Sequence, residues 1–472
     1  MGGNVDLKFL TSSGTAIQKG LSLVWEYVMV SAAEQLSASL TLSNFSRATE
    51  LKARIWFTLG ALIIYRLGTY IPVPGLDASV LKGVFESYSG SILGVFDAFA
   101  GGALGRMSIF ALNIFPYISA SIIIQLMTAV SPQLGQLKKD GDYGRTKLIQ
   151  YTRYLTVILT AIQGYAIAVG LEGMGGSAVH NPGLFFRLTT VITLVGGTVY
   201  LMWLGEQITI RGIGNGISLI IFAGIVAHLP MGVSSLLTLG WTGQISSLSV
   251  LMFVLLAVAV IVAVVYMERA QRRITIQYPK RQVGQQVYGA QSSHLPLKLN
   301  TAGVIPPIFA NALLVIPASI LQFSGGQSSM SWVNDAVAML GHGQPLYMLV
   351  YASLIVFFCF FYTSIVFNPV EVADNLKKNT AFIPGIRPGK ATASYIDSLL
   401  TRLTVFGAGY LVIVCLLPEF LMAEYSIPFY FGGTSLLIVV TVVMDTINHI
   451  NSHLLVHQYD GLMKKNKLVK GR

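Results

Sequence analysis

Continuous apolar runs, separated by polar connections, recur along almost the whole chain. An α-helix needs roughly 20 predominantly apolar residues to cross a bilayer, and a window of that length predicts ten such helices. The runs are solid, as in VLMFVLLAVAVIVAVVYM (250–267), and do not alternate like the strands of a membrane barrel. The pattern therefore predicts an all-α polytopic membrane protein. The predicted spans are approximately Ile55–Ile71, Ser108–Val130, Leu155–Leu171, Phe185–Leu204, Ile213–Leu229, Leu248–Met267, Ala302–Leu321, Leu346–Phe367, Leu403–Leu417 and Phe429–Ile447.

A short apolar stretch, Ile92–Ala100, precedes the second run and is separated from it by three glycines and Arg106. A helix of about ten residues reaches only ~15 Å, at about 1.5 Å per residue. It cannot cross the membrane by itself. Such a broken backbone is tolerated at membrane depth where surrounding protein encloses it.

Composition agrees with the pattern, since 53% of residues are hydrophobic and 11% are charged, against about 25% charged in soluble domains. Basic residues favour the cytoplasmic side of short loops. With ten spans, all but four of the 31 Lys and Arg fall on one side; the exceptions are Arg66, Lys82, Arg106 and Arg187. We therefore expect both termini in the cytoplasm.

Ten spans divide into two halves of five, and an odd number in each half makes the second half run opposite to the first. The chain then divides into an N-terminal segment (1–53), a first half (54–231), a second half (232–450) and a basic tail (451–472). Two connections on the basic side, 268–301 and 368–401, are far longer than packed helices need, so we expect ordered projections. Their charge suits an acidic partner such as RNA or a motor protein.

The sequence disfavours an enzyme, a metal site and a cofactor. It has no His-Glu-x-x-His motif and no Walker phosphate loop, and RGIGNGIS (211–218) follows a helix, so we expect a turn there. The only two cysteines, Cys359 and Cys415, lie inside spans and are expected to be apolar fillers.

Ion-coupled transport is also disfavoured, because such proteins keep ionisable residues near mid-membrane. The sixth to ninth spans contain none, while Arg66 and Asp445 lie toward span ends. No charged or carbonyl-lined ion filter is apparent. What remains is a pore with apolar walls, which a hydrophobic constriction can close. An uncoupled secondary transporter of a small solute stays as the alternative.

Several long strings, in order, resemble the SecY family of bacterial protein-conducting channels. They include GGALGRMSIFALNIFPYISASIIIQL, MWLGEQITIRGIGNGISLIIFAGIVAHLP, AQSSHLPLKLNTAGVIPPIFA, FCFFYTSIVFNPVEVADNLKKNTAFIPGIRPG and PFYFGGTSLLIVVTVVMD. The resemblance covers roughly Arg54 to the C-terminus. It implies two pseudo-symmetric inverted halves of five helices around an hourglass pore, closed by a short re-entrant plug helix at about 91–101. The implied function is to pass unfolded secretory polypeptides across the membrane and to release transmembrane segments sideways into lipid.

The resemblance also assigns residues to four features. The pore ring falls on Ile114, Ile118, Ile217, Ile221, Ile308 and Ile438. The plug contains Ile92, Leu93, Val95, Phe96, Asp97 and Phe99, with a hinge at Gly101, Gly102 and Gly105. The lateral gate, between the second and seventh spans, carries Gln125, Gln163 and Asn300, while Pro306 and Pro307 are expected to break helical hydrogen bonding there. Partner docking falls on Arg272, Arg273, Lys280, Arg281 and Arg387.

The partners implied by the resemblance are SecE and SecG, the SecA motor ATPase, the ribosome with its nascent chain, signal peptides and membrane lipids. The implied location is the bacterial inner membrane. Residues 1–28 resemble nothing in the family, and Met29 begins MVSAAEQLSASLTLSNF, which is typical of a natural bacterial start. We therefore expect residues 1–28 to be an upstream start assignment or a dispensable extension.

Overall fold

The computed structural model describes residues 49–77, 97, 100–173, 179–243, 246–278, 281–283, 286–288, 292–323, 344–425 and 433–470. Residues 1–48, with the expectation about Met29, and the plug residues Ile92, Leu93, Val95, Phe96 and Phe99 lie outside these ranges. Lys280 also lies outside them. The elements below refer to the described part of the chain.

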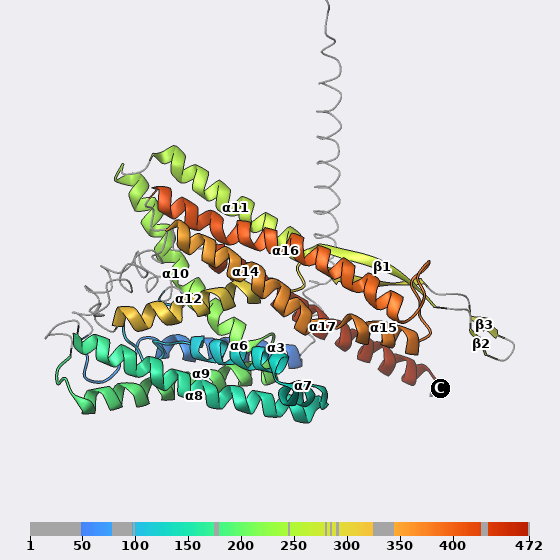
Figure 1. The fold of residues 1–472 in the computed structure, drawn as a ribbon, viewed down its shortest axis with the longest axis horizontal. Coiled ribbons are helices and arrows are strands. Elements are labelled where there is room, and N and C mark those ends of the chain that lie inside the picture. The colour runs from blue at the N-terminus through green and yellow to red at the C-terminus, as the bar shows by residue number, and fades with distance from the viewer. Residues whose placement is uncertain are drawn as a thin grey trace, which may run out of the picture.

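Two groups of helices form the body of the molecule. The first half contains α3 (Thr49–Gly68), α6 (Phe115–Val130), α7 (Pro132–Lys139), α8 (Gly141–Gly173), α9 (Leu184–Arg211) and α10 (Gly216–Trp241). The second contains α11 (Ser247–Arg269), α12 (Ile305–Phe323), α14 (Pro345–Val366), α15 (Pro369–Lys378), α16 (Lys390–Tyr425) and α17 (Gly433–Lys470). In Figure 1, α3, α6, α8 and α9 form one layer, and α11, α14 and α16 form another. Helices α10 and α12 lie between the layers.

Each predicted span falls on a helix of the structure, which confirms the all-α membrane fold. Seven of the described helices are long and apolar enough to cross a membrane, and α6 with α7 forms an eighth candidate bent by 101°. The other two predicted spans coincide with α3, which carries three basic residues, and with α12, whose fully described apolar part is the short stretch Ile305–Leu314.

The second span begins later than predicted, at Phe115 instead of Ser108. Residues 100–114 are buried but follow successive turns. Met107 and Asn113 have φ angles of 42° and 48°, and this left-handed conformation cannot continue a right-handed helix. The chain therefore enters the protein as an irregular segment packed among helices.

Two helices extend beyond the apolar runs that predicted them. The ninth span is part of α16, which begins at Lys390 rather than Leu403, and α17 runs on to Lys470, so most of the predicted tail is helical. These added turns mix charged and polar residues with apolar ones, so they fall outside the apolar windows, and hydropathy alone ended the helices early.

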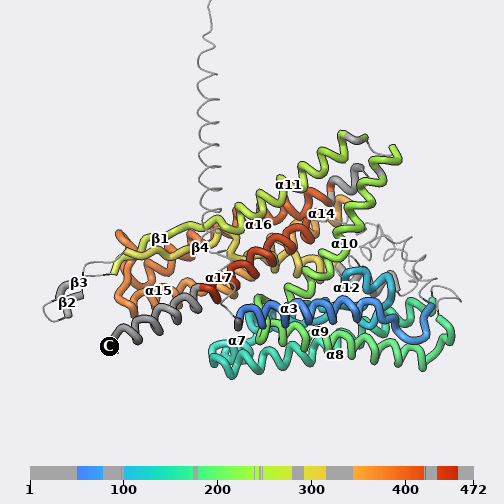
Figure 2. The backbone as a smooth tube through the Cα atoms, turned by 180° about the vertical axis from the view of Figure 1, so that it is seen from behind, coloured from blue at the N-terminus to red at the C-terminus, as the bar shows by residue number. Residues whose placement is uncertain are grey.

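Both long basic connections contain ordered structure, as expected. Strand β1 (Gln271–Gln277) pairs antiparallel with β4 (Ser292–Lys298), and the shorter β2 (Arg281–Val283) pairs with β3 (Gln286–Tyr288). The ribbon formed by these strands projects from one end of the molecule beside α15, as Figures 1 and 2 both show. We call this end the basic end.

One continuous apolar core joins the two halves. It includes Leu201 and Ile220 of the first half and Ile355, Leu411 and Leu437 of the second. Helix α12 packs against α6 and α8 on one side and against α14 on the other. The halves therefore meet along a seam lined by α6 and α8 facing α12, and we use this name below.

Candidate pore constriction

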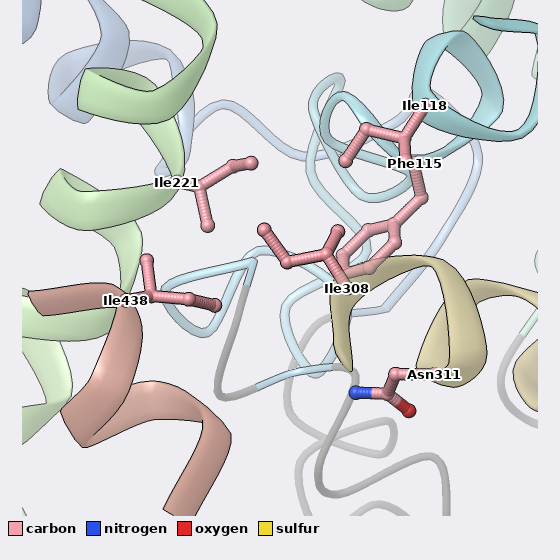
Figure 3. Close-up of a pocket in the computed structure, with 6 residues that line it drawn as sticks. All are labelled: Phe115, Ile118, Ile221, Ile308, Asn311 and Ile438. Atoms are coloured by element: carbon pink, nitrogen blue, oxygen red, sulfur yellow. The ribbon is translucent and has the colours of Figure 1, made fainter. Parts of the chain in front are cut away.

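A small cavity lies between the two halves near the centre of the molecule. Its lining comes from four helices, with Phe115 and Ile118 of α6, Ile221 of α10, Ile308 and Asn311 of α12, and Ile438 of α17. Figure 3 shows Ile118, Phe115 and Ile308 directed toward Ile221 and Ile438 across the space. Four isoleucines that the resemblance assigned to a pore ring are thus brought together from segments far apart in sequence.

Local sequence explains why α6 delivers its side chains here. Pro116 occupies the first turn of α6, where its fixed φ suits a helix and its missing N–H costs no hydrogen bond. The helix starts abruptly after the irregular segment, so Phe115 and Ile118, three residues apart, lie on one face.

The other two predicted ring positions are not among the residues that line this cavity. Ile114 is buried to 1% exposure directly before α6. Ile217 lies in the first turn of α10 and packs toward α9. A Cβ atom added to Gly205 of α9 would lie 3.3 Å from Cγ1 of Ile217. The sequence does not predict Phe115 and Asn311 as lining residues. Their spacing from Ile118 on α6 and from Ile308 on α12 is a signal that could have found them.

The cavity is small and largely apolar. Its volume of about 10 Å³ is at the lower limit of the roughly 10–15 Å³ that a single water needs, together with two to four polar partners. Among the described residues of the lining, Asn311 is the only polar one. The arrangement can therefore keep the passage dry and exclude ions, without binding any particular solute.

The segment that leads from the plug region into α6 is held by hydrogen bonds around its glycines. Gly101 and Gly102 have φ angles of 70° and 77°, as glycine readily adopts. The N–H of Gly102 donates to the Asp97 carbonyl at 2.9 Å, and the N–H of Gly105 donates to the Asp97 carboxylate at 2.8 Å. These bonds close a compact turn at the predicted hinge.

Two arginines hold the same carbonyl of this turn. Arg66 Nη1 and Arg106 Nη2 donate to the Gly101 oxygen at 2.7 and 2.9 Å, and the Arg106 guanidinium lies 4.2 Å from the centroid of the Tyr70 ring. His228 of α10 approaches from another side, since a Cβ on Gly102 would lie 3.2 Å from its Nε2. In the sequence, Arg66 is an ionisable residue toward a span end and Arg106 is part of the break before the second run, but no contact between them is predicted, and His228 is not singled out.

The seam carries only part of the predicted gate chemistry. Gln125 on α6 donates within its own helix, from Nε2 to Ser121 Oγ at 3.1 Å. Gln163 on α8 is partly buried. The structure thus places both amides on the two helices of the first half that face α12.

Asn300 lies at a different place from the one expected. It precedes α12 by five residues, exchanges hydrogen bonds with Gly303 in its own turn, and its Nδ2 lies 3.5 Å from Glu268 Oε2 of α11. Pro306 and Pro307 fall in the first turn of α12, because the helix begins at Ile305. First-turn N–H groups have no partner within the helix, so these prolines do not break its hydrogen bonds.

The two basic connections pack together as one unit. Gln277 at the end of β1 and Phe382, before α16, exchange two backbone hydrogen bonds of 2.9 and 3.0 Å. A separate apolar cluster secures the contact and contains Ile274, Leu297, Ile383, Ile396, Leu400 and Leu403. We call this unit the basic platform (residues 270–301 and 368–402, as far as they are described).

Three of the predicted docking residues are described in full and exposed on this platform. Arg272 and Arg273 lie on β1, and Arg387 lies in the turn before α16, where its carbonyl accepts a hydrogen bond from Thr392 Oγ1 at 2.9 Å. Arg281 belongs to β2. The guanidinium groups of Arg272, Arg273 and Arg387 are therefore presented to solvent from a folded support.

Comparison with known proteins now decides the family. The SecY family model matches residues 108–447. The chain belongs to the SecY family. The protein translocase subunit SecY of Escherichia coli K12 is 54% identical over 421 residues, which cover 89% of this chain and 95% of that protein. This family assignment confirms the expectation of a multi-pass transport subunit rather than an enzyme.

Solved structures share the SecY fold with this family member. A structure described as that of a protein conducting channel has a TM-score of 0.60 and 19% identity, covering 85% of this chain and 92% of that chain. Sec61 in the canine ribosome-channel complex from the endoplasmic reticulum has a TM-score of 0.56 and 18% identity, with the same coverage. The arrangement of helices around the cavity is thus that of the channel fold.

Proposed function

We propose that this chain is the central channel subunit of a Sec translocon. It passes unfolded secretory polypeptides across the bacterial inner membrane and releases transmembrane segments sideways into lipid. The observation that carries the proposal is the apolar constriction between the two halves, where Ile118, Ile221, Ile308 and Ile438 meet. Branched apolar side chains can move apart around an extended chain, and they do not bind particular side chains of it.

The irregular segment supports a movable closure. Residues 91–101, of which the structure describes Asp97, Ala100 and Gly101, act as a plug that closes the pore from outside. Gly101, Gly102 and Gly105 form its hinge, held in the idle state by Asp97 and the arginine pair. The ring consists of the four cavity isoleucines together with Ile114 and Ile217, which join it when the helices separate.

The seam is the lateral gate. The polar groups of its opposing helices include Gln125 and Gln163, and interhelical polar contacts in membranes contribute only about 0.6 kcal/mol on average. An apolar segment that enters the seam can therefore replace the contacts it breaks. Asn300 and the Pro306–Pro307 pair act at the base of α12, where they fix the point from which the helix tilts.

The basic platform is the docking surface on the cytoplasmic side. Arg272, Arg273, Lys280, Arg281 and Arg387 face the SecA motor ATPase or the ribosome, both of which present acidic surfaces. SecE and SecG are the companion subunits, and signal peptides are the ligands of the gate. Both termini are cytoplasmic, which follows from the concentration of Lys and Arg on this side.

Site-specific crosslinking of a stalled secretory chain tests the proposal. A photoreactive residue at position 118 or 438 should capture the chain in transit. The matched control is Leu255 of α11, which is 67% exposed on the outer surface of the helix bundle and faces lipid. Capture at the ring but not at the control supports a polypeptide channel. An absence of capture at every ring position, with active partners present, favours the small-solute carrier.

A further inference from the structure

A side-chain hydrogen bond links the two halves near the basic end. Lys138 Nζ donates a hydrogen bond of 3.0 Å to the carbonyl oxygen of Ile365, across 227 positions of sequence. Lys138 lies in the last turn of α7, which follows α6 after the 101° bend. Ile365 lies in the last turn of α14. The contact therefore runs from the first half to the second.

The sequence after α14 leaves this carbonyl open to an outside donor. In a continuing helix the carbonyl of Ile365 would accept from the residue four positions ahead, but that residue is Pro369, which has no N–H. The N–H of Phe367 is already used by the carbonyl of Thr363, at 3.0 Å. The end of a helix also carries partial negative charge. The ammonium group of Lys138 suits this position because it supplies a hydrogen-bond donor and a positive charge.

The position of the bond relates it to the seam. Helix α7 packs against α6 and α8, while α14 packs against α12. Figures 1 and 2 both place α7 at the same end as α15 and the strands. The bond thus closes the basic end of the seam, outside the pore cavity. Separation of α6 from α12 would draw α7 away from α14 and break it.

We propose that Lys138 is a latch across the lateral gate, and that it determines how apolar a segment must be to open the seam. This inference rests on the proposed function. The latch adds the same free-energy cost to opening by every segment. A strongly apolar signal sequence opens the gate fully even with the latch in place. A weakly apolar signal sequence opens it only in part, so removing the latch raises its fraction of open gates most. Lys138 is therefore a specificity-determining residue for signal sequences.

The first test reads the idle channel and needs no transport. Nitroxide labels at Gln136 on α7 and Asp374 on α15, both exposed, report the distance across the basic end by pulsed electron paramagnetic resonance. Cys359 and Cys415 are replaced by Ala, and the protein is kept in its membrane complex. Lys138→Met should add a longer distance to the distribution.

Two variants serve as controls for that measurement. Lys138→Arg keeps a cationic donor and should preserve the distribution of the parent protein. Lys139→Met removes a neighbouring exposed charge and should also leave it unchanged. If Lys138→Met gives the parent distribution, or if Lys139→Met shifts it equally, the latch is refuted.

The second test measures specificity in inverted membrane vesicles. Lys138→Met should raise export of a reporter whose signal has a shortened apolar core by about two- to fivefold, the range expected for one solvent-exposed charged interaction. Export with an intact signal should change little. Equal effects on both signals would overturn the specificity role. Absence of export by the parent protein would instead count against the proposed function, while the distance measurement would still judge the latch.

Discussion

Replacing two cavity isoleucines by asparagine should wet the idle channel. Ile118 and Ile438 come from opposite halves, are 7% and 1% exposed, and line the same cavity. The double variant Ile118→Asn with Ile438→Asn places two amides where the parent lining has five apolar side chains and one amide. Asparagine is also smaller than isoleucine, so the space grows as its polarity rises.

The size of the expected change in hydration follows from the free-energy cost of keeping the variant cavity free of water. An amide that is buried without a hydrogen-bond partner costs about 1–3 kcal/mol in proteins, so two cost about 2–6 kcal/mol when Asn311 cannot serve both. Water that enters the cavity relieves this cost, because three amides together provide the two to four partners that a water molecule requires. Since about 1.4 kcal/mol is a factor of ten, the wetted population should rise at least ~30-fold.

Planar-bilayer conductance of the purified complex, without partners or substrate, measures this change. We expect frequent ion-conducting openings in the double variant and almost none in the parent. The control pair is Ile122→Asn with Val442→Asn, which also replaces an apolar side chain by an amide, one turn along each of the same two helices and at buried positions outside the cavity lining. Parent-like conductance in the ring variant, or equal conductance in the control pair, would refute the constriction.

Three further predictions concern the hinge, the platform and the base of α12. Gly101→Ala should raise the ion conductance of the channel without substrate, because φ at this position is 70° and the added Cβ would lie 2.6 Å from Arg66 Nη1. Conductance like that of the parent would contradict the role given to the hydrogen bonds from Arg66 and Arg106 to Gly101. Arg387→Glu should leave folding and insertion intact but lower SecA-driven export about tenfold or more, as for a reversed interface charge; normal export in vesicles would remove this residue from the docking surface. Asn300→Leu should lower the thermal midpoint of the purified protein, because Glu268 and the turn before α12 lose their partner; an unchanged midpoint would show that these bonds are not stabilising.

The helices themselves followed from the sequence, because the bilayer imposes a simple length requirement on apolar runs. Each of the ten runs falls on a helix. Helix ends were less predictable. The second span began seven residues late because Met107 and Asn113 adopt left-handed conformations, and hydropathy carries no information about backbone angles.

The ring was predicted from resemblance and not from physical pattern. Isoleucine in an apolar helix faces lipid or core far more often than a pore, and only packing of α6, α10, α12 and α17 brings four of these side chains to one cavity. The same packing placed Ile114 and Ile217 outside the lining of this cavity. It also moved Asn300 into a turn beside α11, away from the seam.

By itself, the sequence determined the membrane class, the number of apolar runs, the charge bias and the family, since each of these is a local or summed property of the chain. Tertiary structure alone decided which side chains meet. The closed cavity, the arginine pair on Gly101 and the bond from Lys138 to Ile365 all join segments distant in sequence. Their geometry depends on how the two halves dock, and no local pattern of residues encodes that docking.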